Sequence, residues 1–287
     1  MDAYKDFPKS IIVEPTVSCN QICPFCPRWK IEKNTGFMEW ELYTKLLDEI
    51  AQYPDRRLSL FRRGESLLHK RIVDMFEYAR PRVSEIQLMT NGTCLTPKIS
   101  EALCDKLDFI SFSLDVKSKF AERRGGNYDK TVEKILYFLG ITDNKKVETQ
   151  VSIVETDDMT QEEVEEFKNF WVDKVNRVRI YQEHSKDGKF GSIQENDRGE
   201  RKTCMKPSYE TLVYFDGTVG RCNHDWNGKI LGDVNQQTIA EVWQNTAYQD
   251  LREQHETLNI TDETCNACDS WYPTLTEQGT GKIIAKS

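Results

Sequence analysis

Short apolar runs alternate with amphipathic stretches from residue 11 to about residue 181, and this alternation constrains the fold more than any other feature of the chain. The runs predict strands, and the stretches between them repeat apolar residues at the helical period. Strands that alternate with helices form parallel β/α units. Six units predict a partial (β/α)6 TIM barrel, an α/β fold with its functional face at the carboxyl ends of the strands. The predicted strands are 11–15, 57–61, 85–90, 109–114, 147–154 and 178–181.

Two helical stretches also carry signals for where a helix begins. Thr96 followed by Pro97 predicts a helix start, because a threonine hydroxyl caps backbone amides and proline suits the first helical position. Residues 160–172 begin with acidic side chains, which the positive end of the helix dipole favours. Apolar residues at helical spacing predict further helices within 38–53 and 130–140.

The character of the sequence changes after the sixth predicted strand. The next twenty residues are polar and lack any strand or helix period, which is typical of a linker or an active-site loop. A compact unit follows, with a hairpin that turns at Asp216–Gly217 and a helix near 238–243. We therefore predict a partial-barrel core over 1–183, a linker or active-site loop over 184–203, a small domain over 204–275 and a C-terminal tail over 276–287.

Charge and cysteine content narrow the function classes. The 287 residues carry a formal net charge of −8, which argues against a general binder of nucleic acid or anionic membrane. The N-terminus lacks the basic and apolar regions of a signal peptide, and no apolar run approaches the roughly 18 residues of a membrane span. We expect a cytoplasmic protein. Nine cysteines in a reducing compartment indicate metal or redox chemistry rather than disulfides.

Three of these cysteines, Cys19, Cys23 and Cys26, directly follow the first predicted strand. Three thiolates cannot complete a tetrahedral protein site, so they favour a metal centre with one open position. A [4Fe–4S] cluster held in this way leaves one iron free for an external ligand, and Phe25 could stack on a purine. The alternatives are a zinc site that borrows a fourth ligand and three reduced thiols without a metal.

The sequence resembles the radical S-adenosylmethionine (radical SAM) superfamily beyond the cysteines. That family has the three-cysteine motif after the first strand, a Gly-Gly-Glu-Pro-like motif after the second and Thr-Asn-Gly after the third. The corresponding segments here read CNQICPFC, RRGESLL and LMTNGT, and FISFSLD at the fourth strand is also similar. The second motif departs from the family pattern, because Arg63 replaces the first glycine and Ser66 replaces the proline.

The resemblance implies cofactors and site residues. The three cysteines would ligate a [4Fe–4S] cluster, and S-adenosyl-L-methionine would bind its open iron and yield a 5′-deoxyadenosyl radical. By position, Gly64 and Glu65 would hold the methionine end, while Ser113 and Arg124 would reach the ribose or the carboxylate. A buried strand serine and a surface cation are the alternatives for the last two. Flavodoxin or ferredoxin would supply the first electron.

Four further cysteines lie in the small domain, at Cys204, Cys222, Cys265 and Cys268. Four thiolates close a tetrahedral or cuboidal site, so the residues alone indicate zinc or iron–sulfur equally. The segment resembles the short "twitch" form of the SPASM domain, which implies one auxiliary [4Fe–4S] cluster. A cluster without an open iron is suited to accept the electron that a substrate radical must lose.

Within the superfamily, the order and spacing of the seven cysteines resemble the butirosin-pathway 2-deoxy-scyllo-inosamine dehydrogenases. This resemblance implies an oxidoreductase that oxidises a secondary alcohol of an aminocyclitol or sugar. Substrate contacts are expected to differ, since Asn223 stands where those enzymes have a phenylalanine. The alternatives are a maturase of a ribosomal peptide, disfavoured because the first strand begins by residue 11, an epimerase with Cys94 as hydrogen donor, and a two-zinc binding module.

The sequence does not identify the catalytic base. His224, Asp225, Lys186 and Asp187 fall in segments that could face the barrel mouth, and Glu14 lies at the end of the first predicted strand. A structural or solvated role is the alternative for each of them.

Overall fold

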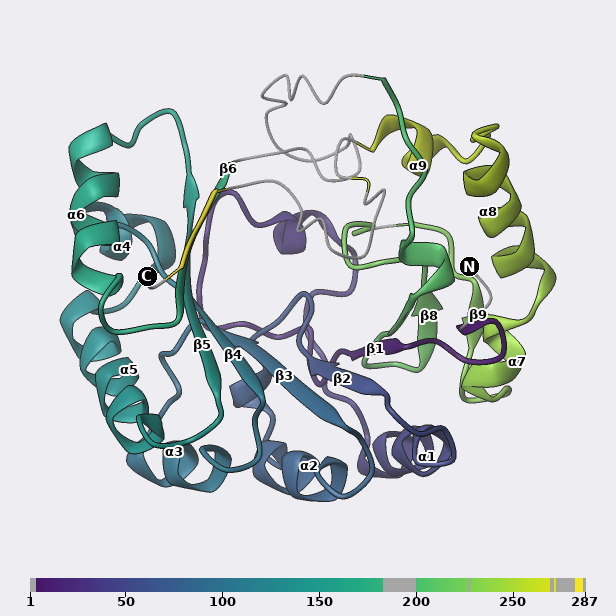
Figure 1. Cartoon of the computed structure of the whole chain (residues 1–287), viewed down its shortest axis with the longest axis horizontal. Coiled ribbons are helices and arrows are strands. Elements are labelled where there is room, and N and C mark those ends of the chain that lie inside the picture. The colour runs from purple at the N-terminus through teal and green to yellow at the C-terminus, as the bar shows by residue number, and fades with distance from the viewer. Residues whose placement is uncertain (1–3, 183–199, 227, 269–270, 272–281, 286–287) are drawn as a thin grey trace.

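The computed structural model of the chain describes residues 4–182, 200–226, 228–268, 271 and 282–285. Its strands form a ten-stranded sheet, within which β1 to β6 run parallel in chain order. This part of the sheet curves into an open barrel (Figure 1). The partial (β/α)6 barrel predicted from the sequence is therefore confirmed. Its strands are β1 (Ser10–Val13), β2 (Arg57–Leu60), β3 (Glu85–Thr90), β4 (Phe109–Ser113), β5 (Glu148–Glu155) and β6 (Arg177–Gln182).

The helices that connect these strands cover the outer side of the barrel sheet (Figure 1). The Thr96 hydroxyl accepts a hydrogen bond from the amide of Ile99 where α3 begins. Thr160 and Glu163 form a reciprocal capping box where α6 begins. Both helices begin where the sequence predicts them. The helices are α1 (Trp40–Ile50), α2 (Ile72–Ala79), α3 (Pro97–Leu103), α4 (Lys117–Arg124), α5 (Tyr128–Thr142) and α6 (Gln161–Trp171).

Side chains alternate between the two faces of the barrel sheet, and the inner face is polar. In β3, Ile86 and Leu88 are fully buried in the core beneath the helices, whereas Gln87 lies on the opposite face and lines the barrel interior. Branched apolar residues fill the interior of a complete TIM barrel. Here the residues that line the interior include Ser59, Gln87, Ser111, Gln150 and Arg179. The barrel centre is therefore suited to a polar guest rather than to a dry core.

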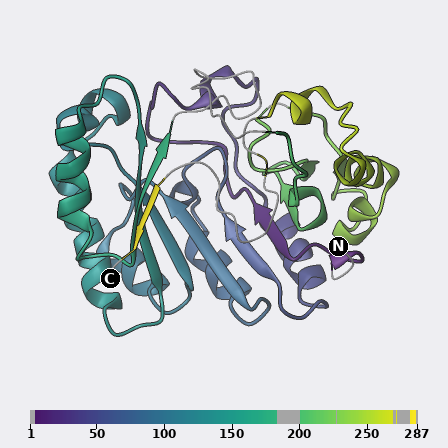
Figure 2. The same cartoon turned by 45° about the horizontal axis from the view of Figure 1, so that its top comes forward.

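The small domain extends the same sheet beyond β1. β7 (Glu210–Val213) pairs parallel with β1, and β8 (Thr218–Gly220) and β9 (Gly232–Asp233) follow in antiparallel order. The hairpin turns at the predicted Asp216–Gly217, where Gly217 has a φ of 87° that favours glycine. Backbone hydrogen bonds thus join the two units, and Figure 2 shows the small domain beside the barrel from a second side. The domain also contains α7 (Ile239–Trp243), α8 (Thr246–Thr257) and α9 (Glu263–Ala267).

The remaining elements are short. β10 (Lys282–Ala285) pairs antiparallel with β6 at the far edge of the sheet, in a segment for which the sequence predicts only a tail. Single 3₁₀ turns occur at Pro27–Lys30, Ser66–Leu68 and Lys206–Ser208. Most of the predicted linker, including Lys186 and Asp187, lies outside the described residues. Within the described part of the chain, no helix combines the length and the apolar character needed to cross a lipid bilayer.

Candidate functional site

Cys19, Cys23 and Cys26 lie in a loop that leaves the carboxyl end of β1, and we call residues 14–37 the cysteine loop. An isolated β-bridge between Thr16 and Phe37 closes its base. Burial raises the pKa of the Cys19 thiol to about 11 and also raises the pKa of Cys23. Thiolates in such surroundings need compensating positive charge, which a metal centre supplies. This donor set therefore fits a metal cluster that uses three protein ligands.

Gly64 and Glu65 pack directly against the cysteine loop. The Glu65 amide donates to the Ser18 carbonyl over 2.9 Å. A Cβ atom on Gly64 would come within 2.3 Å of the Thr16 carbonyl oxygen, so only glycine fits this position. The close approach fixes the backbone that immediately precedes Cys19. Glycine at this position of the second motif is therefore explained by a contact between two loops.

The Glu65 side chain is used within the protein. Its fully buried carboxylate accepts hydrogen bonds from the Thr90 hydroxyl and the Asn91 amide, each over 2.7 Å, and from the Leu67 amide over 3.1 Å. Burial raises the pKa of Glu65, and these three donors act in the opposite direction. Glu65 thus joins the end of β2 to the Thr-Asn-Gly segment that follows β3.

The Thr-Asn-Gly segment in turn contacts the cysteine loop. The Asn91 side chain donates to the Asn20 side chain over 2.9 Å and lies 3.9 Å from the Cys19 sulfur. Asn20 also donates to the Thr93 hydroxyl over 2.8 Å and lies 3.7 Å from the Cys94 sulfur. Asn91 therefore positions the cysteine loop. Cys94 lies beside the same contact and is half-buried.

Phe25 and Arg124 lie together on the other side of the cysteine loop. The Arg124 guanidinium lies 5.3 Å from the centre of the Phe25 ring and 4.0 Å from the Cys23 sulfur. It also forms an ion pair over 3.4 Å with Asp115, whose side chain is fully buried. Arg124 is only 5% exposed, so it is a buried cation rather than a surface one. Ser113, the other residue predicted to reach the cofactor, ends β4 with a half-buried side chain.

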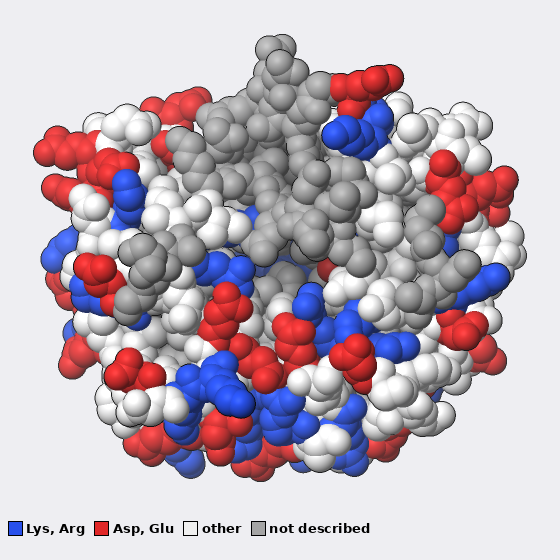
Figure 3. Space-filling view, viewed as in Figure 1, with Lys and Arg blue, Asp and Glu red and all other residues white. Residues whose placement is uncertain are grey.

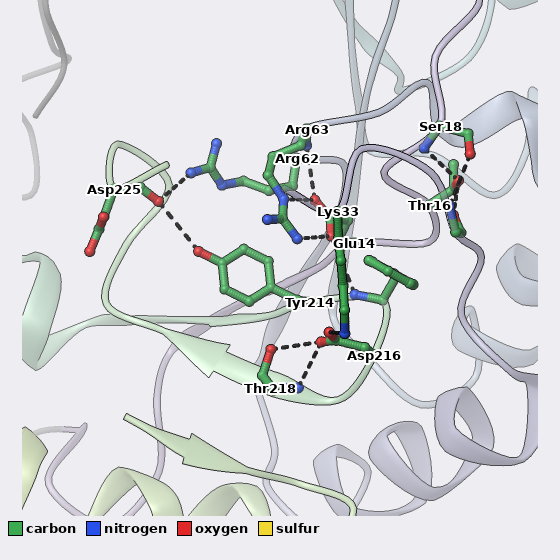
Figure 4. Close-up of polar contacts among 12 residues, drawn as sticks. Glu14, Thr16, Ser18, Lys33, Arg62, Arg63, Tyr214, Asp216, Thr218 and Asp225 are labelled. Carbon is green, nitrogen blue, oxygen red and sulfur yellow. Dashed lines mark hydrogen bonds and ion pairs between the residues drawn. The ribbon is translucent and has the colours of Figure 1, made fainter. Parts of the chain in front are cut away.

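A buried ion pair connects the barrel to the small domain (Figure 4). Arg63 donates from its backbone amide over 3.1 Å and from Nε and Nη2 over 2.7 Å each to the Glu14 carboxylate, which is fully buried. The Phe215 amide in the hairpin donates to the same carboxylate over 3.3 Å. The Arg63 guanidinium stacks on the Tyr214 ring at 4.0 Å. The arginine that departs from the family motif therefore holds the hairpin against the end of β1.

A second set of contacts continues from this ion pair to the four-cysteine segment. Arg62 donates to the Asp225 carbonyl over 2.6 Å, and the Tyr214 hydroxyl donates to the same oxygen over 3.3 Å (Figure 4). The Asp225 carboxylate pairs with Arg221 over 2.6 Å, and Arg221 also pairs with Asp262. Asp262 accepts a hydrogen bond from the amide of Cys265 over 3.0 Å. Glu14 and Asp225, two of the proposed bases, are thus engaged in structural ion pairs.

Cys204, Cys222, Cys265 and Cys268 line one small cavity. Burial raises the pKa of Cys222 to about 11 and raises the pKa of Cys265 above its ordinary range. His255 of α8 lines the same cavity and is 3% exposed, and within the described part of the chain neither ring nitrogen has a hydrogen-bond partner. Burial lowers its pKa to about 4, so the ring is neutral at pH 7. The four thiols fit the ligand set of an iron–sulfur cluster, and the sulfurs of such a cluster could accept a hydrogen bond from the His255 imidazole.

A larger cavity of about 640 Å³ occupies the barrel interior. This volume lies within the range of small-molecule sites. Asn223 and His224, which directly follow Cys222, lie in its wall together with residues from all six barrel strands. Asn223 accepts a hydrogen bond from Lys206 over 2.5 Å. The segment after Cys222 therefore faces the barrel interior.

Comparison with protein families assigns both parts of the chain. The model of the radical SAM superfamily matches residues 13–171. The chain belongs to the radical SAM superfamily. The model of an iron–sulfur cluster-binding domain of the SPASM type matches residues 204–269. The predicted cofactors of this radical SAM enzyme, S-adenosyl-L-methionine and [4Fe–4S] clusters, agree with both assignments.

Solved structures share the fold over most of the chain. BtrN in complex with AdoMet and 2-DOIA is 21% identical, with a TM-score of 0.64 over 95% of this chain and 98% of BtrN. Streptococcus suis SuiB bound to the precursor peptide SuiA is 14% identical, with a TM-score of 0.70 over 86% of this chain and 67% of SuiB. The enzyme anSMEcpe with bound AdoMet is 17% identical, with a TM-score of 0.65. At these identities the comparison establishes the fold and leaves the substrate open.

Curated relatives match shorter regions. A cofactor-modifying protein for the tungsten-containing aldehyde ferredoxin oxidoreductase of Pyrococcus furiosus is 32% identical over 110 residues, or 38% of this chain and 31% of that protein. GTP 3',8-cyclase of Clostridium perfringens is 27% identical over 161 residues, or 52% of this chain and 47% of the cyclase. The match therefore spans less than half the length of each relative.

The buried Glu14–Arg63 pair generates a stability prediction. Glu14→Gln should lower the free energy of unfolding by about 3–5 kcal/mol, because it leaves the Arg63 guanidinium buried without its counter-charge. Chemical denaturation of the anaerobically prepared protein measures this change. Lys33→Gln is the matched control, since Lys33 pairs with Asp216 at the surface and its loss should cost less than about 1 kcal/mol. Equal effects of the two substitutions would contradict the structural role of the buried pair.

Proposed function

We propose that the protein oxidises a secondary alcohol of an aminocyclitol or sugar and passes an electron to an auxiliary [4Fe–4S] cluster. One observation carries this proposal: Lys206 and His224 line both the barrel cavity and the four-cysteine cavity. A substrate in the barrel would therefore lie beside the group that accepts its electron. The polar inner face of the barrel suits a molecule rich in hydroxyl groups.

The proposal keeps the residue roles that the sequence predicts. Gly64 and Glu65 would present backbone groups to the methionine end of the cofactor, since the Glu65 carboxylate is already bonded within the protein. Phe25, Ser113 and Arg124 would contact the rest of S-adenosyl-L-methionine. We retain a core over 1–183, a linker over 184–203, a cluster domain over 204–275 and a tail over 276–287. The ligands would be Cys19, Cys23 and Cys26 for the first cluster and Cys204, Cys222, Cys265 and Cys268 for the second.

When bound and reduced, these cofactors supply a 5′-deoxyadenosyl radical that removes a hydrogen atom from the substrate. The chain contributes orientation, charge and exclusion of water. The Arg124–Asp115 pair would hold a fixed cation beside Cys23, where the cofactor carboxylate is expected. The Glu14–Arg63 pair would hold the hairpin, and with it the four-cysteine site, against the barrel.

Oxidation of an alcohol to a ketone also releases a proton, which a protein group must accept. Among the five candidates from the sequence, Glu14 and Asp225 are held in buried ion pairs. His224 lies in the wall of the barrel cavity, next to Cys222 in the chain. We therefore assign His224 as the proton acceptor. Flavodoxin or ferredoxin stays the predicted electron donor.

The proposed function predicts two separable activities. With S-adenosyl-L-methionine and a low-potential reductant, the reconstituted enzyme should release 5′-deoxyadenosine, and Cys23→Ala should abolish this release because it removes a ligand of the first cluster. Cys268→Ala should still release 5′-deoxyadenosine but should lose ketone formation from the alcohol substrate, because the electron acceptor is impaired. Chromatography and mass spectrometry measure both products. Turnover of a peptide, or ketone formation by Cys268→Ala at the wild-type rate, would contradict the proposal.

A further inference from the structure

Charged side chains in the barrel cavity are arranged mainly as ion pairs. Arg57 pairs with Glu85 over 2.8 Å, and Arg177 pairs with Glu148 over 3.0 Å, across the amino ends of neighbouring strands. Near the small domain, Lys206 pairs with Glu210 over 3.3 Å. Each of these cations has its counter-charge in the protein. On the face of the molecule shown in Figure 3, basic and acidic side chains are likewise interspersed.

Arg179 differs from the other cations that line this cavity. It lies on β6, one inward position beyond Arg177, and is 9% exposed. Among the described residues its Nε atom has no hydrogen-bond partner, and its guanidinium lies 4.4 Å from the centre of the Tyr181 ring. No carboxylate among the described residues pairs with it. Burial of a guanidinium without an anion costs free energy, and a negatively charged ligand would offset that cost.

The other side chains that line the cavity indicate which further groups such a ligand would carry. The walls of the same cavity present hydroxyl and amide groups, and several of these bond to each other: Gln150 donates to the Ser111 hydroxyl over 2.8 Å, and Ser59 donates to Gln87 over 3.3 Å. Such groups can also bond to the hydroxyls of a small ligand. Planar guanidinium matches carboxylate and phosphate oxygens in a two-point contact. The cavity thus combines one anion site with a hydroxyl-binding wall.

We propose that the substrate is a polyhydroxylated small molecule that carries an anionic oxygen group, a carboxylate or a phosphate, and that Arg179 binds this group inside the barrel. The inference rests on the proposed function. It narrows the substrate class from aminocyclitols and sugars in general to sugars or cyclitols that carry an acid group. A cationic amino sugar would instead place its ammonium group beside an uncompensated guanidinium, which like charges disfavour.

Binding of four matched hexoses tests this inference without turnover. The probes are D-glucuronate, D-glucose 6-phosphate, D-glucose and D-glucosamine, titrated anaerobically into the reconstituted holoenzyme with S-adenosyl-L-methionine and no reductant. At least one of the two acids should bind about ten- to a hundredfold more tightly than glucose, because a charged hydrogen bond is added. Comparison of the two acids distinguishes carboxylate from phosphate. Equal binding of all four probes, tighter binding of glucosamine, or no binding of either acid would overturn the inference.

Substitutions of Arg179 test whether this residue causes the binding preference for the acids. Arg179→Gln should remove the preference for the acid, and Arg179→Lys should retain part of it, since lysine keeps the charge but loses the planar fork. Arg71→Gln is the charge-matched control, because Arg71 is exposed on the outer side of the barrel. Release of 5′-deoxyadenosine by each variant, measured without substrate, separates a failure of this inference from a failure of the proposed function. An unchanged acid preference in Arg179→Gln would overturn the assignment.

His255 carries a second inference independently. Its imidazole is buried in the cavity that the four cysteines line, and both ring nitrogens lack a hydrogen-bond partner among the residues that the structure describes. A neutral imidazole has one N–H donor, and the acceptors missing here are what the sulfurs of a cluster provide. We infer that His255 donates a hydrogen bond to a sulfur of the auxiliary cluster and thereby raises its reduction potential, because the bond stabilises the added negative charge.

The reduction potential of the auxiliary cluster tests the role of His255. In an anaerobic titration followed by electron paramagnetic resonance, His255→Phe should shift the potential of the auxiliary signal to a more negative value. His255→Gln, which restores an N–H donor, should recover part of the shift. The signal of the three-cysteine cluster serves as the internal control and should not move. An unchanged auxiliary potential in His255→Phe would overturn the inference.

Discussion

The buried contact between Glu14 and Arg63 supports the arrangement of both cysteine sites. Glu14 ends the first barrel strand, Arg63 follows the second, and the hairpin of the small domain donates its Phe215 amide to the same carboxylate. Because the carboxylate is fully buried, its charge is tolerated only while these donors stay in place. The cysteine loop and the four-cysteine domain are therefore fixed to one point. The proposed transfer of an electron from a substrate in the barrel to the four-cysteine site depends on a constant separation between the barrel and that site.

The polar barrel interior provides space for a ligand next to the four-cysteine site. Ser111 and Gln150 occupy positions that apolar residues fill in a closed TIM barrel, so the cavity can hold a hydrated molecule. The cavity ends at His224, which also borders the four-cysteine site. Arg179 adds a charge that the described protein groups leave unmatched. In the proposed function, this one space would hold a hydroxyl-binding wall, an anion site at Arg179 and the neighbouring electron acceptor.

The sequence predicts those parts of the structure that depend on local pattern. All six barrel strands, the Thr96 helix cap, the helix that follows Thr160 and the Asp216–Gly217 turn lie where periodicity, helix-start signals and turn chemistry place them. The contacts that join distant segments leave no local pattern in the sequence. In the sequence Arg63 is only a departure from a family motif, whereas in the structure it pairs with Glu14 and stacks on Tyr214 in the hairpin. Polar residues at alternate positions of the strands, such as Ser59 and Gln87, can be recognised in the sequence. Only the curved sheet shows that these side chains contact each other across neighbouring strands.

Mössbauer spectroscopy of the protein reconstituted with ⁵⁷Fe tests the central claim most directly. The account has two [4Fe–4S] clusters, one held by three cysteines with an open iron and one held by four cysteines with none. Addition of S-adenosyl-L-methionine should therefore change the signal of a single iron among about eight per chain. A spectrum that is unchanged by S-adenosyl-L-methionine, or about four irons per chain, would contradict it.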